Sequence, residues 1–158
     1  MRQTYETKDD RERETEIATI CARAWDCEAL KLKIAAELDY VFHRGGEIHA
    51  VVEIKDRTSG RGYSSHDMDR MGGYMISACK YQSAKRWCET HTSAFVLIVR
   101  LTDGIFWRRW TQTLPRVDIA LGGRSDRGDW QDKEPCVFLP MSTFTRLRVP
   151  PQLAVVTP

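Results

Sequence analysis

The residue types with the clearest chemical potential in this chain are two carboxylates and an amine, at Asp39, Glu53 and Lys55. Carboxylate oxygens suit Mg²⁺, which is usually bound by one or two of them together with waters and phosphate oxygens. A lysine ammonium beside such an ion can orient a water or balance charge that develops on a phosphate. The three side chains can act together only if the fold brings Asp39 next to the Glu53–Lys55 stretch.

A β-hairpin is the element that would bring them together. Alternating apolar residues on both sides of the Gly45-Gly46 turn predict two strands, Glu37–His43 and Ile48–Lys55, joined through a three-residue turn or a bulge. Because a one-residue slip would exchange the two faces of a strand, matching the apolar faces selects one register. The residues that this register pairs are Leu38 with Ile54, Tyr40 with Val52 and Phe42 with Ala50.

The same register places Asp39 opposite Glu53. Two carboxylates facing each other on adjacent strands, with Cβ atoms about 5 Å apart, repel and should destabilise the sheet. Such conflicts are typical of functional sites, and a divalent cation would compensate this one. Lys55 lies on the same face as Glu53, about 6.6 Å further along the strand. The alternative interpretation is a solvated strand face, on which Glu53 pairs with Lys55 and Asp39 has a salt bridge of its own.

Asp39 followed by Glu53-Ile54-Lys55 resembles the core of the PD-(D/E)XK nuclease superfamily, with an acid on one strand and an acid-x-lysine on the next. The chain departs from that pattern at Leu38, where the name-giving proline would stand. The resemblance implies an α/β fold: a restriction-endonuclease-like core of order α-β-β-β-α-β-β, with a mixed central sheet and an irregular C-terminal extension. We expect a single domain over residues 1–158, with the core at about 10–110 and the extension at about 111–158.

The resemblance also implies roles for particular residues. Asp39, Glu53 and Lys55 would be catalytic, and Mg²⁺ or Mn²⁺ would be held by Asp39, Glu53 and the backbone carbonyl of Ile54. Members often begin with a helix that bears a further metal-binding glutamate. Glu16 is the best match here, because it flanks the apolar stripe of the first predicted helix, and Glu12 is the reserve choice.

The remaining elements follow from periodicity and turn signals. A stripe at i, i+3, i+4 and i+7 predicts an amphipathic helix over Asp10–Trp25. A short strand is expected at Ala29–Ile34 and a second helix at roughly Asp67–His91. The almost wholly apolar run Ala94–Leu101 predicts a strand buried on both faces, and Ile105–Trp110 its partner.

Basic, hydroxyl and aromatic side chains beside the predicted site suit contacts with nucleic-acid phosphates. The candidate nucleic-acid-binding residues are Arg57, Arg61, Tyr63, Lys80 and Lys85. An ordinary polar loop and solvated lysines are the alternative. Further along, Trp107 and Trp110, with Arg108 and Arg109, either fill a core or interface or stack on bases.

The composition indicates an ordinary globular protein rather than a membrane protein. The chain has 158 residues, of which 42% are hydrophobic and 29% charged, as in an ordinary globular protein. No apolar run approaches the length of a membrane span, and no signal peptide or P-loop is recognisable. Five scattered cysteines indicate free thiols in a reducing compartment. We therefore expect a cytoplasmic protein with neither a membrane partner nor a nucleotide cofactor.

Several segments, such as Tyr74–Ser77, Leu101–Ile105 and Gly122–Asp129, are similar to parts of small bacteriophage proteins. That similarity implies a phage or prophage origin, and hence the bacterial host cytoplasm. The leading hypothesis is a Mg²⁺-dependent DNA endonuclease, structure-selective and acting as a homodimer by analogy with junction resolvases. The alternatives are a non-catalytic DNA- or protein-binding module that keeps the nuclease fold, and a phage assembly or host-interaction protein.

Overall fold

The apolar stripe predicted near the N-terminus forms helix α1 (Lys8–Ala24). The computed structural model describes residues 7–33, 38–110, 118–123 and 133–148. Thr7 caps α1, because its side chain accepts a hydrogen bond from the N–H of Asp10 while the Asp10 carboxylate accepts one from the N–H of Thr7. Four residues at helical spacing form the buried side of α1: Ile17, Ala18, Cys21 and Ala22.

In the part of the chain that the structure describes, nine strands form two sheets. The strands are β1 (Glu28–Lys31), β2 (Tyr40–Arg44), β3 (Glu47–Asp56), β4 (Tyr74–Ser77), β5 (Ala94–Leu101), β6 (Gly104–Arg109), β7 (Asp118–Gly123), β8 (Lys133–Leu139) and β9 (Thr145–Arg146). The six-stranded sheet has the order β1-β2-β3-β5-β6-β9, and the three-stranded sheet has the order β4-β8-β7. Since β3 and β5 run parallel and the other neighbours antiparallel, the central sheet is mixed, as predicted for this α/β fold.

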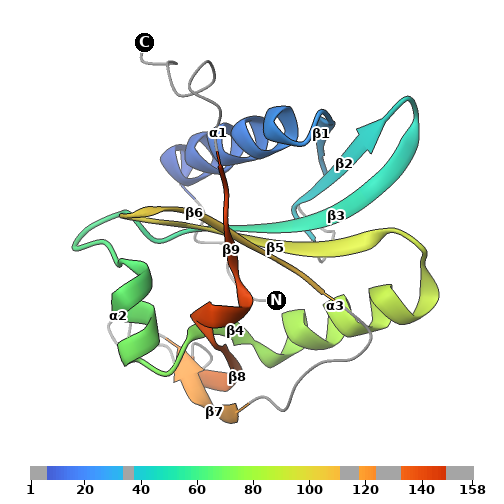
Figure 1. Ribbon diagram of the computed structural model, residues 1–158. Helices are drawn as coiled ribbons and strands as arrows, with labels where there is room; N and C mark the ends of the chain where they lie inside the picture. Colours follow the sequence, from blue (N-terminus) through green and yellow to red (C-terminus); the bar gives the residue numbers. More distant parts are fainter. Residues whose placement is uncertain (1–6, 34–37, 111–117, 124–132, 149–158) are drawn as a thin grey trace.

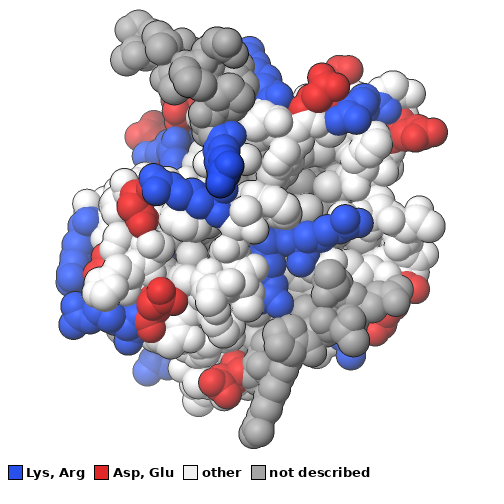
Figure 2. All heavy atoms as spheres, in the orientation of Figure 1, with Lys and Arg blue, Asp and Glu red and all other residues white. Residues whose placement is uncertain are grey.

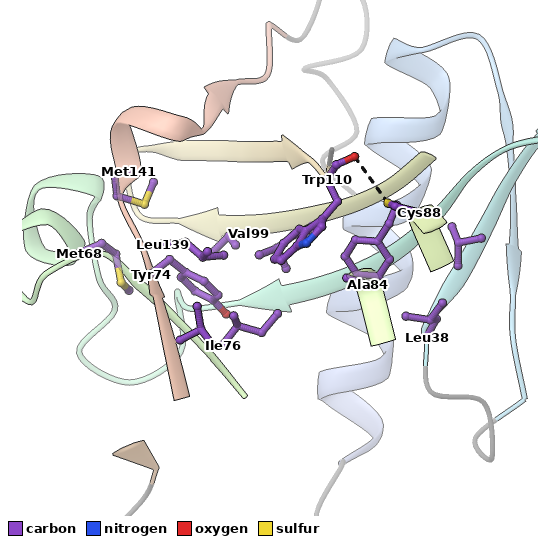
Figure 3. Packing of buried hydrophobic residues seen from close by; sticks show 14 of the residues in the cluster. Leu38, Met68, Tyr74, Ile76, Ala84, Cys88, Val99, Trp110, Leu139 and Met141 are labelled. Atoms are coloured by element: carbon purple, nitrogen blue, oxygen red, sulfur yellow. Dashed lines mark hydrogen bonds between the residues drawn. The ribbon is translucent and has the colours of Figure 1, made fainter. Parts of the chain in front are cut away.

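The central sheet separates two hydrophobic cores (Figure 1). Helix α1 covers one face, where Val52 and Ile54 of β3 are buried against it. The other face is covered by α3 (Ala78–Thr90) together with β4 and β8, and Val51 points to that side. Figure 3 shows part of this second core, in which Tyr74, Leu139 and Trp110 pack together. Glu53 follows Val52 in β3, so its side chain lies on the α3 face.

The predicted hairpin register is confirmed within β2, but the third predicted pair is not formed: Leu38 lies before β2 and joins the core on the α3 side, whereas Ile54 joins the core on the α1 side. Tyr40 pairs with Val52 and Phe42 with Ala50, and the expected bulge lies after Phe42, before His43. The turn needs glycine, because Gly45 and Gly46 have φ values of 57° and 84°. Asp39 lies just before β2 and outside the regular register, and its N–H donates to the carbonyl of Val52 at 3.1 Å. The start of the β2 strand therefore brings Asp39 beside Glu53.

The prediction of one continuous helix over Asp67–His91 is wrong. The chain instead forms the short helix α2 (Ser65–Arg70), then strand β4, and only then α3. Gly72 and Gly73 break the helical pattern, with φ values of 90° and 122°. A Cβ atom at Gly73 would also collide with the carbonyl oxygen of Leu139, so the close approach of β4 and β8 requires glycine there.

The C-terminal extension, expected to be loop-rich with one short strand at Cys136–Leu139, contains that strand as part of β8 and two further strands, β7 and β9. Strand β8 pairs with both β4 and β7, and β9 adds a strand to the edge of the central sheet beside β6. A 3₁₀ turn, η2 (Met141–Thr143), joins β8 to β9. Val137 and Leu139 of β8 and Met141 of η2 thus belong to the core on the α3 side of the central sheet. Within the described ranges, no helix is long and apolar enough to cross a membrane.

The turn between β5 and β6 holds the start of α2. The carboxylate of Asp103 accepts hydrogen bonds from the N–H of Ser65 at 2.9 Å and from its hydroxyl at 2.5 Å. Partial burial raises the pKa of Asp103, but the bonds from Ser65 outweigh it and leave the pKa below its usual value. A carboxyl group with a lowered pKa stabilises the fold above its ordinary pKa, and this stability is lost as the pH falls through the lowered value.

We therefore expect Asp103→Asn to lower the free energy of unfolding at pH 7 by about 1–2 kcal/mol, because an amide accepts these bonds less strongly. The deficit should shrink below about pH 4, where the wild-type carboxyl also becomes neutral. Urea unfolding at pH 7 and at pH 3 measures both effects. Asp69→Asn, on the exposed side of α2, is the matched control. An equal loss of unfolding free energy at both pH values would show that the charge of the Asp103 carboxylate does not strengthen its bonds with Ser65.

Candidate metal centre

Glu53 is a carboxylate enclosed in the middle of the central sheet. Its strand, β3, lies between β2 and β5, and its side chain is 0% exposed. Two lysines meet it: the Nζ of Lys55 lies 2.7 Å from Oε1, and the Nζ of Lys80 lies 2.9 Å from Oε2. Lys55 comes from the same strand and Lys80 from the first turn of α3. A buried carboxylate with an ammonium at each oxygen is the centre of the site.

Asp39 joins the site from the neighbouring strand segment. Its Oδ2 accepts a hydrogen bond from the backbone N–H of Ile54 at 2.8 Å and lies 3.7 Å from the Nζ of Lys55. The structure therefore brings Asp39, Glu53 and Lys55 together, with Lys55 between the two acids. The alternative of a solvated strand face does not hold, because the Glu53 side chain is fully enclosed.

The two carboxylates control the charge on Lys55. Burial lowers the pKa of the Lys55 ammonium, but the negative charges of Glu53 and Asp39 outweigh burial and raise this pKa above its usual value. Lys55 is therefore a cation throughout the neutral range. It can donate hydrogen bonds or balance negative charge, but it cannot serve as a general base.

The glutamate that α1 directs toward the site is Glu14, and not Glu16. Glu16 is 56% exposed at its side chain and pairs with Arg100 at 2.8 Å, beside Asp56. The Glu14 side chain is only 14% exposed, and the charges of Asp39 and Lys55 act on it. Burial raises the pKa of Glu14, although Lys31 donates a hydrogen bond to it at 2.6 Å. Glu12, the reserve choice, is on the exposed side of α1, where it pairs with Lys8.

A signal for Glu14 was present in the sequence. The buried residues of α1 lie three, four, seven and eight positions after Glu14, so Glu14 begins the buried stripe of the helix. Glu16 lies off this stripe. Lys31, the partner of Glu14, belongs to β1 and stands over the ring of Tyr40, with 4.8 Å between Nζ and the ring centroid.

Of the five predicted nucleic-acid-binding residues, only Lys80 contacts the carboxylates. Arg57 follows the end of β3 and lies over the ring of Tyr74, 5.8 Å from its centroid. Arg61 and Tyr63 are exposed in the loop before α2. Lys85 is on the outer side of α3, where it pairs with Glu89 at 3.9 Å. The arginines within Gly122–Asp129 lie outside the described residues.

The carboxylates of the site fit a divalent cation if the lysine ammonium groups that now pair with them move aside. In the described ranges, no three side chains of His, Cys, Asp or Glu converge closely enough to hold an ion as they stand. However, Oε1 of Glu53 is fully buried, and its contact in the described residues is the ion pair with Lys55. Asp39, Glu53 and Glu14 would offer the carboxylate oxygens that Mg²⁺ prefers. Three lysines, Lys31, Lys55 and Lys80, now balance their charge.

The remaining predicted residues of interest belong to the core. Trp110 is 2% exposed and packs edge-on against Phe95, and Trp107 packs against Trp25, the residue that follows α1. These tryptophans therefore fill the core rather than present free faces to bases.

The family model described as phage putative PDDEXK endonuclease matches residues 1–147 of the chain. No curated protein matches it.

Proposed function

Because the chain belongs to the phage putative PDDEXK endonuclease family, we propose that it cleaves DNA by metal-dependent hydrolysis of phosphodiester bonds. The observation that carries the proposal is the buried carboxylate of Glu53, which lies between two lysines and beside Asp39. Burying a carboxylate is costly unless it is paired, and a purely structural strand would gain more from an apolar residue at this position. Such an arrangement is typical of a site kept for its chemistry.

Asp39 and Glu53 would hold a Mg²⁺ or Mn²⁺ ion, with Glu14 and the carbonyl of Ile54 as further ligands. When bound, such an ion polarises the phosphate and lowers the pKa of a water molecule. Lys80, whose ammonium now pairs with Oε2 of Glu53, would turn toward the phosphate that enters the site.

Lys55 would orient the attacking water and balance the charge that grows on the phosphate. Its ammonium is fixed between Asp39 and Glu53, so it needs little reorganisation before the reaction. In the proposed reaction, the water oxygen forms a bond to phosphorus while the bond from phosphorus to the leaving oxygen breaks. The water proton passes to solvent, and the leaving oxygen takes a proton in turn. No covalent enzyme intermediate is required.

The test uses the full chain with supercoiled plasmid and with nicked, branched, single-stranded and duplex DNA, and with RNA of matched sequence. Each substrate is incubated with Mg²⁺ or Mn²⁺ and, as the control, with EDTA. We expect cleavage only with metal, and the substrate cut fastest shows the preference. Binding without cleavage of any substrate would favour a non-catalytic module that keeps the fold.

The homodimer and the host cytoplasm also remain proposals. A two-fold dimer would present two sites to the two strands of a duplex. Sedimentation of the free protein, together with the ratio of nicked to linear plasmid early in the reaction, distinguishes a dimer from a chain that acts alone.

A further inference from the structure

Arg108 is a buried cation without an acidic partner. It lies in β6 and is 6% exposed, yet among the described residues no carboxylate lies within ion-pair distance of its guanidinium. The other well-buried arginine, Arg100, differs in this respect, since it pairs with Glu16 and Asp56. A guanidinium removed from water without a counter-charge is costly, and here burial lowers the pKa of Arg108.

The contacts of Arg108 leave one edge of its guanidinium available. Nη1 donates to the hydroxyl of Thr143 at 2.6 Å, and the group stands over the ring of Trp110, 5.3 Å from the centroid. Nε and Nη2 form no hydrogen bond within the described part of the chain, and neither is a fully enclosed nitrogen. The small exposed area of the residue therefore includes this edge. Nε and Nη2 together form the fork that binds carboxylate and phosphate oxygens in a bidentate manner.

A second donor near Arg108 also lacks a partner. The indole Nε1 of Trp110 is buried without a hydrogen bond, although Trp110 is 2% exposed. Figure 3 shows Trp110 beside Cys88, whose thiol donates to the Trp110 carbonyl at 3.7 Å. The ring of Tyr81 lies 5.4 Å from that of Trp110. An unpaired guanidinium edge beside an unpaired N–H is a surplus of donors, which suits an anion.

The position of Arg108 relates this edge to the metal centre. Glu53 pairs with Leu97 of β5, and Leu97 pairs with Arg108 of β6. Paired residues share a face, so Arg108 and Glu53 lie on the same side of the sheet, two strand spacings or roughly 10 Å apart. Successive residues of α3 reach the two places, Lys80 at Glu53 and Tyr81 at Trp110.

We propose that the Nε–Nη2 edge of Arg108 binds a phosphate group of the nucleic acid, beside the metal centre and on the same face of the sheet. This inference rests on the proposed function for the identity of its ligand. The distance corresponds to about three base-pair steps along B-DNA, so a strand bound at Glu53 reaches Arg108 with a nearby phosphate. Figure 2 shows Lys and Arg side chains across the middle of one face, over β5, β6 and β9. The positive charge of these side chains would attract a polyanion.

The test compares Arg108→Lys with Arg109→Lys in the full chain, with EDTA present throughout. Both changes keep the charge and remove a guanidinium fork, but Arg109 is exposed on the opposite face. We expect Arg108→Lys to weaken binding of a DNA duplex at least about tenfold and Arg109→Lys by less than about twofold. Inorganic phosphate should raise the melting temperature of the wild type, beyond chloride at equal ionic strength, and should not do so for Arg108→Lys.

A duplex with 5′-phosphates identifies the source of the phosphate. Tighter binding of this duplex than of a hydroxyl-ended one, lost in Arg108→Lys, supports a terminal phosphate, and equal binding supports a phosphate within the strand. Unchanged DNA and phosphate binding in a less stable Arg108→Lys protein would overturn the proposal, because Arg108 would then only join β6 to Thr143. EDTA prevents cleavage, so this result does not depend on whether the protein is a nuclease.

Discussion

Replacing Glu53 with Gln should abolish metal-dependent cleavage, with a loss of at least about a thousandfold. Gln keeps the shape of the side chain but removes the negative charge that a divalent cation needs. We expect the affinity for Mn²⁺, measured by calorimetry, to fall together with the rate of plasmid cleavage. Unfolding free energy should fall by about 3 kcal/mol or less, because Lys55 and Lys80 lose their counter-charge but, at 30% and 31% exposure, can turn toward water.

Glu47→Gln is the matched control for this change. Glu47 lies in the same strand, β3, but is exposed near the turn. The control protein should bind metal and cleave as the wild type does. If a folded Glu53→Gln protein cleaved plasmid within tenfold of the wild-type rate, Glu53 would not be part of the catalytic site.

Lys55→Met should separate catalysis from metal binding. The ammonium of Lys55 contacts the carboxylates but is not itself a metal ligand, so its removal takes a competing cation away from Glu53 and Asp39. We expect Mn²⁺ to bind at least as tightly as to the wild type. Cleavage should nevertheless fall by about a hundredfold or more, because the group that orients the water and balances phosphate charge is absent.

The control is Lys8→Met, at an 83% exposed side chain on α1. It also removes one positive charge and should leave both measurements unchanged. If Lys55→Met lost metal binding in parallel with activity, Lys55 would support the fold of the site rather than the reaction.

The hairpin could be predicted from sequence because its information is local. The apolar faces of β2 and β3 match in one register only, and that register determines the approach of Asp39 to Glu53. The fold class and the family resemblance followed from the same few residues, and the match over residues 1–147 confirmed them. The roles of Asp39, Glu53 and Lys55 in the reaction remain predictions.

What could not be predicted depends on contacts between distant segments. Lys80 was predicted to lie beside the site from the family resemblance alone, whereas its contact with Glu53 depends on β4 and the glycines before it, which place the start of α3 against the sheet. Gly73 is required by the carbonyl of Leu139, which is far away in sequence. The sequence could have distinguished Glu14 from Glu16. Following the buried stripe of α1 back toward the N-terminus of the helix leads to Glu14. Extended apolar residues near Val137 likewise gave no sign that β8 would pair with β4.

The near-neutral balance at the metal centre has a consequence for how the protein matures. Three acidic and three basic side chains already satisfy one another, so the polypeptide can complete its fold during synthesis without waiting for an ion. Small zinc domains behave in the opposite way, because metal binding supplies their folding free energy. Under the proposed function, a divalent cation would therefore bind to a scaffold that is already folded. Withdrawal of the ion would stop the reaction without exposing the protein to proteolysis.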